Sequence, residues 1–408
     1  MQIKTKPFFL LFLVLSINVY AQETISDTSH SSVNSSSGSE VDIVDIIKEV
    51  FGLHPSLKAA NMKPGDKPVL SVLPAVGYTL QTRLAVILTG NIAFYTSNKA
   101  GTPLSVFNAA AYYTQNKQFT VPVQLSVWNR KGTFNLLGDW RYMKYPQSTF
   151  GLGSNSSLSN EDPLNYQYIR LYQYIVRKVA KNFSAGIGYN LDHYWKITER
   201  GLSNGALSDF GKYGTGSKAT SSGYSMHLIF DSRTNPINSR QGLLAFISYR
   251  NNVKWMGSNS NWQSLSTDIR KFFSLGRSSK QVLGFWFYNW MILHGKPPYL
   301  DLPSTGWDRF TNTGRGFIQG RFRGNNMVYA ESEYRFNLTH NGLFGAVLFA
   351  NAESFSDASS LQLQKLQPAA GFGFRMKLNK KSDTNIAVDY GFGTQGMRGL
   401  FVNIGEVF

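Results

Sequence analysis

The sequence has 408 residues and no cysteine, which excludes disulfides, thiolate metal sites and a cysteine nucleophile. Aromatic residues make up 14% of it, and 41 Lys and Arg residues against 24 Asp and Glu residues give a formal net charge of +17. Such a charge is compatible with binding to nucleic acid or to lipid phosphates, and also with cations that line a lumen and solvated loops.

The first 21 residues have the pattern of a secretory signal peptide. Lys4 and Lys6 precede an apolar run over residues 8–17, and residues 19–21 (Val-Tyr-Ala) offer a small-residue cleavage site. A membrane-spanning helix is the weaker interpretation, because it needs about 20 apolar residues. An exported chain rarely meets nucleic acid, so we expect no nucleic-acid partner and favour lipids and lipopolysaccharide as the anionic partners.

Two short segments follow. Residues 22–40 are polar and Ser-rich, which predicts a disordered linker. Residues 41–51 carry apolar side chains at helical spacing and end before Gly52, which predicts an amphipathic helix of about three turns. The apolar face of this helix needs a cover, so we expect residues 41–67 to be periplasmic and the helix to dock at or inside the mouth of the main body. An irregular segment packed on a sheet is the alternative.

From residue 68 to residue 408 apolar and polar residues alternate. In residues 223–233 one face carries Tyr224, Met226, Leu228 and Phe230, and the other carries Ser225, His227, Asp231 and Arg233. Residues 327–338 repeat the pattern, with Tyr329, Glu331, Glu333 and Arg335 on the polar face. Because successive strand residues point to opposite faces, each segment is a strand with one apolar and one polar face.

We interpret the alternating segments as an all-β fold, a transmembrane antiparallel β-barrel of sixteen strands. The length of the strands and the aromatic residues near their ends favour a membrane barrel over a large soluble β-sandwich or β-propeller, although fourteen or eighteen strands also fit. Turn signals stand at residues 96–102, 129–132, 276–279, 339–342 and 379–383, and long loops at 147–164, 198–218 and 293–325 are expected to face the cell exterior.

The last residues of the sequence fit a final membrane strand. Phe408 shares its parity with Leu400, Val402 and Ile404, and a terminal aromatic residue is typical of outer-membrane barrels. Glu406 interrupts this apolar row, which places the last turn at the membrane interface.

Four stretches of the sequence stand out together. They are SVLPAVGYTLQTRLAV at 71–86, FDSRTNPINSRQGLL at 230–244, GRGF at 314–317, and AESEYRF at 330–336 with LFANAESF at 348–355. Their order and spacing resemble the barrel of the BamA/TamA-like outer-membrane assembly superfamily, the bacterial surface antigen family, over about residues 68–408. The second stretch resembles a family hairpin, here formed by Asp231, Arg233, Asn235, Pro236 and Gly242.

GRGF resembles the tip of the long sixth external loop of this family, which folds back into the barrel. The resemblance implies that Arg315, Gly316 and Phe317 form the tip, and that its partners on the lumen wall are Glu331, Glu333, Phe349, Asn351 and Glu353. A buried arginine needs a carboxylate partner, and its guanidinium can donate two parallel hydrogen bonds to one. The family's second acid is Asn351 here, which cannot neutralise an arginine, so Glu353 is expected to substitute for it. A solvated loop arginine is the alternative.

The resemblance implies that the barrel inserts or translocates proteins or lipids at the outer membrane. Partners would be unfolded outer-membrane proteins, other barrel subunits or a second copy of the chain. Members that insert other barrels carry repeated periplasmic polypeptide-transport domains, and others carry a patatin lipase domain. Neither fits in residues 23–67, so we expect a barrel-only member. Pro74 and Gly77 weaken the pairing of the first strand, so the seam between first and last strands is where the barrel would open. A passive pore, or a structural or surface-binding barrel, is the alternative function.

The sequence does not favour an enzyme, and we expect no cofactor and no metal. The six histidines do not stand at metal-ligand spacing, and no Gly-x-Ser-x-Gly motif is present. His227 shares a face with Ser225 and Asp231, but residues two and four apart on one strand are about 7 and 13 Å apart by the rise alone, too far for a proton relay. A lipid hydrolase is therefore the weakest functional hypothesis.

Overall fold

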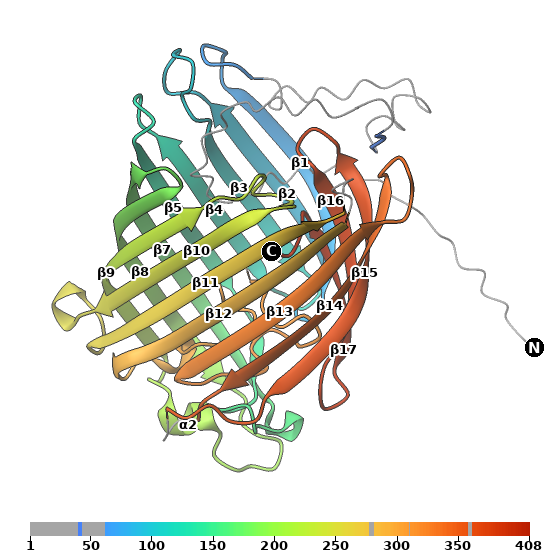
Figure 1. The fold of residues 1–408 in the computed structure, drawn as a ribbon. Helices are drawn as coiled ribbons and strands as arrows, with labels where there is room; N and C mark the ends of the chain where they lie inside the picture. Colours follow the sequence, from blue (N-terminus) through green and yellow to red (C-terminus); the bar gives the residue numbers. More distant parts are fainter. Residues whose placement is uncertain (1–39, 43–61, 277–280, 310, 358–360) are drawn as a thin grey trace, which may run out of the picture.

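The structure is a computed structural model that describes residues 40–42, 62–276, 281–309, 311–357 and 361–408. These residues form one antiparallel sheet of seventeen strands that curves into a barrel (Figure 1). The strands are β1 (Val69–Thr79), β2 (Arg83–Phe94), β3 (Ser105–Thr114), β4 (Phe119–Trp128), β5 (Phe134–Lys144), β6 (Gln147–Thr149), β7 (Asp162–Ala180), β8 (Phe183–Glu199), β9 (Lys218–Asp231), β10 (Gly242–Asn252), β11 (Trp262–Leu275), β12 (Gln281–Gly295), β13 (Asn326–Asn337), β14 (Phe344–Phe355), β15 (Gln367–Asn379), β16 (Thr384–Phe392) and β17 (Arg398–Ile404).

The described helices are short and lie between strands. They are η2 (Leu158–Asn160), α2 (Asp209–Tyr213), η3 (Lys254–Met256) and η4 (Tyr299–Asp301). No helix in the described part of the chain has the length and apolar character that crossing a membrane requires. The predicted all-β class is therefore confirmed.

The alternation predicted from sequence is present in the strands. In β9 the side chains of Met226 and Leu228 are exposed on the outer face, whereas Ser225 and His227 are buried. In β13 Glu331 and Glu333 are buried in the same way. The outer face is therefore apolar and the lumen is lined by polar and charged groups, as period-two patterning requires.

The predicted turns lie between strands or at strand ends, except that the turn at 276–279 lies largely outside the described residues. The loops predicted at 198–218 and 293–325 lie between strands and overlap them by one to three residues, whereas the loop predicted at 147–164 contains β6 and the first three residues of β7. The long connections β5–β7, β8–β9 and β12–β13 lie at one end of the barrel, because successive antiparallel connections alternate between ends. Figure 1 shows α2 at this end, at the bottom of the view. The β9–β10, β13–β14 and β15–β16 turns lie at the other end.

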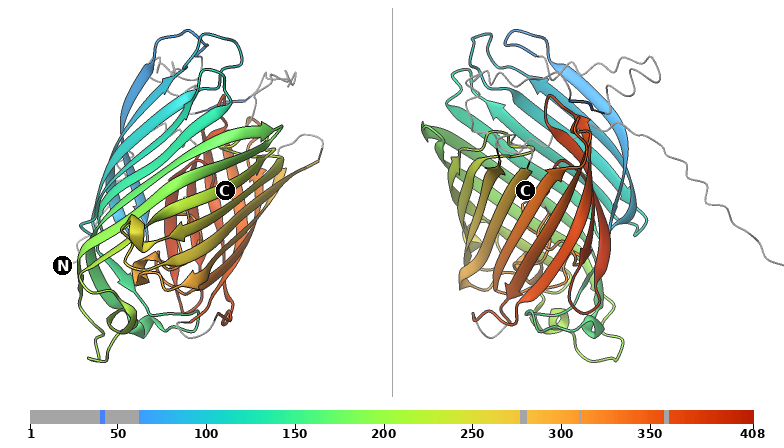
Figure 2. Two further views of the ribbon diagram at one scale, coloured as in Figure 1. Left: turned by 90° about the vertical axis from the view of Figure 1, so that its left-hand side faces the viewer. Right: turned by 45° about the vertical axis from the view of Figure 1, so that its right-hand side comes forward.

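The sheet has an open seam between its first and last strands. β1 pairs with β2 and β17 pairs with β16. Cα atoms of β1 and β17 approach to within 8 Å, but no ladder joins these two strands in the described part of the chain. Figure 2 shows the first strands, in blue, beside the last strands, in red. The sheet is thus not closed by a ladder in the described residues, whereas the sequence predicted a barrel with a weakly paired first strand.

Four predictions about the chain and its strands stay open. The sixteen-strand count stays a prediction, since the sheet has seventeen strands and one of them, β6, has three residues. The signal peptide, most of the linker and most of the predicted 41–51 helix lie outside the described residues. In the described part, the Val41 N–H donates to Asn341 O (3.0 Å) and Asp42 Oδ2 accepts from Lys380 N (2.8 Å). Residues 40–42 therefore lie on the β13–β14 and β15–β16 turns.

Candidate functional site

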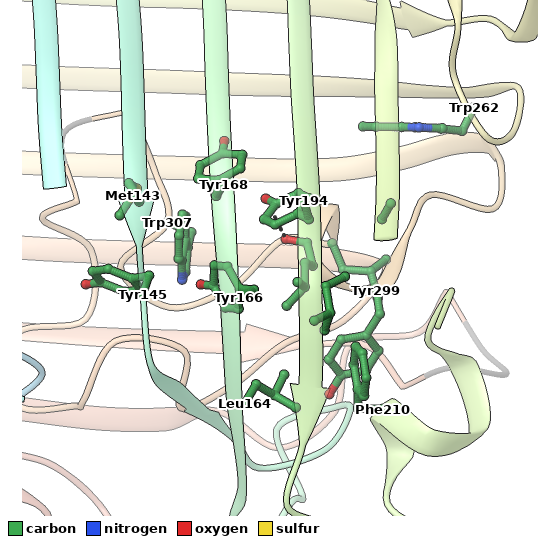
Figure 3. Packing of buried hydrophobic residues seen from close by; sticks show 14 of the residues in the cluster. Met143, Tyr145, Leu164, Tyr166, Tyr168, Tyr194, Phe210, Trp262, Tyr299 and Trp307 are labelled. Atoms are coloured by element: carbon green, nitrogen blue, oxygen red, sulfur yellow. Dashed lines mark hydrogen bonds between the residues drawn. The ribbon is translucent and has the colours of Figure 1, made fainter. Parts of the chain in front are cut away.

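The β12–β13 loop enters the barrel, and most of its described residues are buried. Toward the end of the barrel where α2 lies, Trp307 packs against Tyr145 and Tyr168. The ring centroids are 6.0 and 6.2 Å apart (Figure 3). Tyr299 from η4 belongs to the same aromatic cluster. Further along the loop Phe317 belongs to a second cluster of buried residues. Two apolar anchors, one near each end of the loop, thus hold the segment between them against the wall.

Arg315 lies at the tip of this loop and is buried, with 3% of its surface exposed. Its Nη2 donates to Glu331 Oε1 and to Glu333 Oε2, and its Nη1 donates to Asp389 Oδ2 (2.9 Å). Three carboxylates, from β13 and β16, therefore surround one guanidinium. Such an arrangement offsets the desolvation of the arginine and fixes the loop tip in one place. Arg315 is thus an internal clamp and not a solvated loop residue.

Glycines let the tip approach the wall closely. Gly314 and Gly316 have φ of +84° and +106°, values that residues other than glycine rarely adopt. A Cβ on Gly316 would lie 2.9 Å from Ala369 Cβ, and one on Gly391 of β16 would lie 2.8 Å from the Gly316 Cα. Each side of the contact therefore depends on the absence of a side chain.

The remaining tip contacts are aromatic and amide in character. The Arg315 guanidinium stands 3.9 Å from the centroid of the Phe349 ring, a cation–π geometry. Asn351 Nδ2 donates to the main-chain oxygen of Arg315 (2.9 Å). Phe317 packs edge-on against Phe322 at 5.4 Å. Asn351 thus holds the backbone of the tip and not its charge.

Glu353 does not replace the missing family acid, which corrects the expectation from sequence. Its Oε1 accepts from Thr305 Oγ1 (2.9 Å), elsewhere in the same loop. The additional carboxylate comes instead from Asp389, which lies 38 residues after Asn351 in the sequence. Strand parity within β14 could not reveal it, because the residue belongs to a strand two positions further along the sheet.

Arg321 and Arg323, which follow the tip in the same loop, are buried and bind neutral oxygens. Arg321 donates to Ser156 Oγ (2.9 Å) and to Gln395 Oε1 (2.8 Å). Arg323 Nη1 donates to the main-chain oxygens of Tyr299 (3.0 Å) and Leu300 (3.1 Å). Arg321 and Arg323 therefore stabilise the loop from inside the barrel, and their side chains are not available to lipid phosphates.

The tip's carboxylates are shared with further arginines. Arg335 Nε donates to Glu333 Oε1, and Arg375 Nη1 donates to Asp389 Oδ1 (2.5 Å). Arg375 Nε also donates to Glu406 Oε2 (2.7 Å). We call Arg315, Glu331, Glu333, Arg335, Arg375, Asp389 and Glu406 the lumen charge cluster.

The position of the last residues differs from the sequence prediction. Glu406 and Phe408 are 8% and 3% exposed and face the lumen, whereas a last membrane strand would have put Phe408 on the lipid face. The physical reason is Gly405, whose φ of +93° turns the chain away from the direction of β17. Gly405, which stands directly before Glu406, was the feature of the sequence that could have indicated this turn.

The predicted family hairpin is compact and lies at the end opposite the long loops. Asp231 Oδ2 pairs with Arg233 Nη2 (2.8 Å), and both side chains are buried. Asn235 Oδ1 accepts from Ile237 N (2.8 Å) across Pro236, whose main-chain oxygen accepts from Arg233 Nη1 (3.5 Å). Gly242 has φ +113°, and a Cβ there would lie 2.4 Å from Ser232 O. The structure thus brings these residues together, and the hairpin residues Asn238 and Ser239 accept from Arg335 Nη1 of the lumen charge cluster (both 3.3 Å).

His227 is buried in the lumen, and one argument made about it from sequence was wrong. Ser225 Oγ and His227 Nε2 are 2.8 Å apart, because side chains two residues apart can lean toward each other along a strand. The His227 Nδ1 has no hydrogen-bond partner among the described atoms, and Asp231 pairs with Arg233. The pair therefore lacks a group that would orient the imidazole as a base. The described residues also contain no group of three or more metal-ligating side chains that could hold a metal ion.

A cavity of about 370 Å³ lies between the seam and the loop tip. β1 lines it from Ala75 to Thr79, and β17 with the following residues lines it from Phe401 to Val407. Arg315 and Phe317 of the tip form part of its floor. The open edge, the loop tip and the lumen charge cluster therefore meet at one place.

Comparisons with known proteins identify the fold. No protein-family model matches the chain, and no curated protein matches it in sequence. Among solved structures, the chain is similar to BamA from Haemophilus ducreyi lacking POTRA domains 1–3, with a TM-score of 0.58, 14% identity and coverage of 83% of this chain and 70% of that one. It is also similar to CdiB from Acinetobacter baumannii (TM-score 0.56, 13% identity, 83% and 60% covered) and to CdiB from Escherichia coli (0.50, 12%, 85% and 69%).

The chain spans about 60% of the length of the Acinetobacter structure and about 70% of the other two. At these identities the similarity describes architecture and not activity. The suspected resemblance is therefore supported at the level of fold, and the chain has the barrel fold of BamA and CdiB.

Proposed function

We propose that this chain is an integral outer-membrane barrel that helps to insert or translocate proteins or lipids, with its N-terminal segment in the periplasm. The observation that carries the proposal is the seam, where no ladder joins β1 to β17 in the described residues and a cavity of about 370 Å³ lies behind them. In hydrocarbon each unpaired backbone group costs several kcal/mol. An edge in that position therefore favours an incoming strand, whose backbone can form hydrogen bonds with it.

The barrel wall itself is proposed to have sixteen spanning strands. β5 and β6 both pair with β7, over Phe134–Lys144 and Gln147–Thr149 respectively. They act as one strand with an interruption, so the seventeen strands correspond to 17 − 1 = 16 crossings. A length of seven residues for β17, against nineteen for β7, makes the seam the weakest edge of this wall.

The similarity to BamA and CdiB barrels supports a function in insertion or translocation, and unfolded outer-membrane proteins or other barrel subunits are the proposed partners. A second copy of the chain is a further proposed partner. A passive pore is less well supported, because the β12–β13 loop enters the barrel and Arg315 is clamped by three carboxylates. Neither proposal involves a catalytic residue, a cofactor or a metal.

A reversible lock at the seam tests the proposal. A Cβ on Gly399 of β17 would lie 2.2 Å from the side chain of Leu80, directly after β1. The variant Leu80→Cys/Gly399→Cys should therefore cross-link in a chain that has no other cysteine. In proteoliposomes we expect the cross-link to abolish the accelerated folding of a small outer-membrane barrel added as an unfolded chain, and a reductant to restore it.

The matched control is a cross-link where a ladder already exists. Ile187 of β8 and Met226 of β9 are paired in register and both face outward. The Ile187→Cys/Met226→Cys variant should leave the acceleration unchanged in either redox state. If the seam cross-link also leaves it unchanged, gating through the seam is wrong, and a pore or structural barrel becomes the better interpretation.

A further inference from the structure

The last four residues of the sequence are held in the lumen by side chains and not by a strand ladder. The β16–β17 ladder ends with Ile386 opposite Ile404, after which the Gly405 N–H donates to Asn385 O (2.7 Å). Val407 and Phe408 are 1% and 3% exposed. Figure 1 shows this end of the chain within the outline of the barrel. The segment is therefore bound to the wall much as a short peptide would be.

The pocket around Phe408 has one aromatic and one cationic side. The ring of Phe408 lies 5.4 Å from the ring of Trp286 and 5.9 Å from that of Phe272. Gly284 lies between them, and a Cβ there would approach the Phe408 ring to 3.2 Å. Arg335 Nη2 donates to the main-chain oxygen of Phe408 (2.6 Å), with its guanidinium 5.6 Å from the ring centroid. Ring and main-chain oxygen are thus recognised separately.

The two residues before Phe408 add a charge contact and a loop contact. Glu406 accepts from Arg375 Nε (2.7 Å) and from Asn385 Nδ2 (2.6 Å). The main-chain oxygen of Val407 accepts from Asn312 Nδ2 (2.6 Å) in the β12–β13 loop. The site therefore selects an acidic residue two positions before an aromatic one, while the middle side chain makes no polar contact.

We propose that this pocket, formed by Phe272, Gly284, Trp286, Arg335 and Arg375, is a binding site for a Glu-x-Phe peptide segment, filled here in cis by residues 406–408. The segment can exchange with the same sequence supplied in trans, because its withdrawal breaks a few side-chain contacts and no ladder. A tethered ligand has an effective concentration of the order of millimolar, so a segment in trans competes only when the tether has moved or is absent.

Occupancy of the pocket is linked to the loop tip through shared partners. Arg375 contacts both Glu406 and Asp389, and Asp389 contacts Arg315. On the other side Arg335 contacts the Phe408 oxygen and Glu333, which also contacts Arg315. Removal of the segment takes one acceptor from each of Arg335 and Arg375. Their remaining partners include Glu333 and Asp389, the carboxylates that also contact Arg315, so the contacts of the loop tip should change with occupancy of the pocket. This inference does not depend on what the barrel inserts or moves.

Peptide binding to a truncated barrel tests the site. The probe is a fluorescein-labelled peptide of residues 403–408, and the receptor is the chain without residues 405–408, in detergent micelles. We expect binding by fluorescence anisotropy, weakened about tenfold or more when the peptide's Glu is replaced by Gln or its Phe by Ala. The peptide variants avoid any folding defect in the barrel. The intact chain should bind the probe about tenfold more weakly than the truncated one.

Two results would overturn the site: equal affinity of the intact and truncated chains, or equal affinity of the probe and its Phe→Ala variant. Loop coupling has its own readout, the rate at which maleimide labels Ile318→Cys, a half-buried position next to the tip. We expect labelling about tenfold faster in the truncated chain, and the probe peptide should reverse it. Asp162→Asn, which neutralises a buried carboxylate that accepts from Gly201 N (2.9 Å) at the start of β7, is the control and should leave the rate unchanged. An unchanged rate after truncation would overturn the coupling.

Discussion

The β7–β8 wall and the seam are held together by different forces. β7 and β8 have nineteen and seventeen residues, and their ladder runs from Leu164 opposite Glu199 to Ala180 opposite Phe183. β17 has seven residues, pairs only over Ile386–Phe392 on one side, and has no ladder to β1 in the described residues. What stands behind the seam instead is the lumen charge cluster.

The difference teaches where each kind of mutation should act. Backbone hydrogen bonds of a ladder depend on the distance between its strands, so the β7–β8 wall should resist changes in backbone spacing. A buried charge cluster depends on its charges, because removing one partner leaves another charge buried and uncompensated. The seam should therefore be sensitive to charge and tolerant of changes in spacing.

The largest effect is expected from Arg315→Ala. It leaves Glu331, Glu333 and Asp389 without their shared cation, which costs about 3–5 kcal/mol for a buried pair. Arg315→Lys should recover part of this loss, since lysine keeps the charge but not the planar fork. Urea unfolding of the lipid-embedded barrel, followed by tryptophan fluorescence, measures both.

A double-mutant cycle with Glu333→Gln locates the effect. We expect a coupling energy of about 1–3 kcal/mol between Arg315 and Glu333. For comparison, Asp162→Asn neutralises a buried carboxylate that accepts from Gly201 N (2.9 Å) at the start of β7, and its effect should add to that of Arg315→Ala without coupling. A cycle without coupling between Arg315 and Glu333 would contradict the clamp.

Two glycines with equally close neighbours compare the wall and the seam directly. A Cβ on Gly223 of β9 would lie 2.0 Å from Asn251 O, a backbone atom of the next strand, whereas one on Gly399 would lie 2.2 Å from the Leu80 side chain. Gly223→Ala should cost about 1–3 kcal/mol of unfolding free energy, because the ladder has to shift. Gly399→Ala should cost less than about 1 kcal/mol, because β17 has no ladder on that side.

Chemical denaturation of the two glycine variants measures this difference. Leu80→Ala added to Gly399→Ala should remove the remaining cost, while no single side-chain truncation should rescue Gly223→Ala. Equal losses for the two glycine variants would show that the seam is as rigid as the wall.

The β12–β13 loop is anchored at both regions, and pH separates the two anchors. On the wall side, Ser221 Oγ donates to Asp301 Oδ2 (2.5 Å). Burial of this carboxyl, helped by the nearby Asp192, raises the pKa of Asp301 to about 7. Because an unfolded aspartate has a pKa of about 3.9, the folded state holds the proton more tightly between these values. The unfolding free energy should therefore fall as pH rises from about 4 to about 7, by at most about 1.4 kcal/mol per pH unit.

Asp301→Asn should remove this slope, because the amide does not titrate. The measurement is the difference in unfolding free energy between the variant and the parent chain at pH 5, 6, 7 and 8. The gap should widen in favour of the variant as pH rises, and then level off above the pKa of Asp301. A constant gap across this range would contradict the raised pKa.

Much of the fold could be predicted from the alternation of apolar and polar residues, and part of the candidate site from the Arg-Gly-Phe motif. Period two places Glu331, Glu333 and His227 on the lumen face, and the Arg-Gly-Phe resemblance brings Arg315 to Glu331 and Glu333, as the structure has them. These are local properties, since Glu331 and Glu333 are on the strand that follows the loop directly. The open seam, in contrast, was expected only as a weak point and not as an absent ladder.

What sequence could not supply depends on contacts between distant strands. Asp389 reaches Arg315 from β16, and parity alone cannot say which of many inward acids is nearest. The inward turn after Gly405 reverses the face of Phe408, so the terminal aromatic residue that suggested a lipid-facing strand is a lumen residue. A single glycine conformation therefore changed the interpretation of the three residues after it.

The smallest effect is expected at the end of the barrel where residues 40–42 lie. Asp42 Oδ2 accepts from Lys380 N (2.8 Å) in the β15–β16 turn, next to the seam strands. Asp42→Asn keeps the shape but weakens a hydrogen bond to a charged acceptor, which we expect to cost about 1 kcal/mol or less. Asp66→Asn, in which an exposed carboxylate that accepts from Lys63 N is neutralised, is the matched control. If residues 40–42 stabilise the seam side, hydrogen exchange in β15–β17 should be faster in Asp42→Asn than in the parent chain. Exchange in β7–β8 should be unchanged. If Asp42→Asn changes hydrogen exchange equally in β15–β17 and in β7–β8, this contact does not stabilise the seam side in particular.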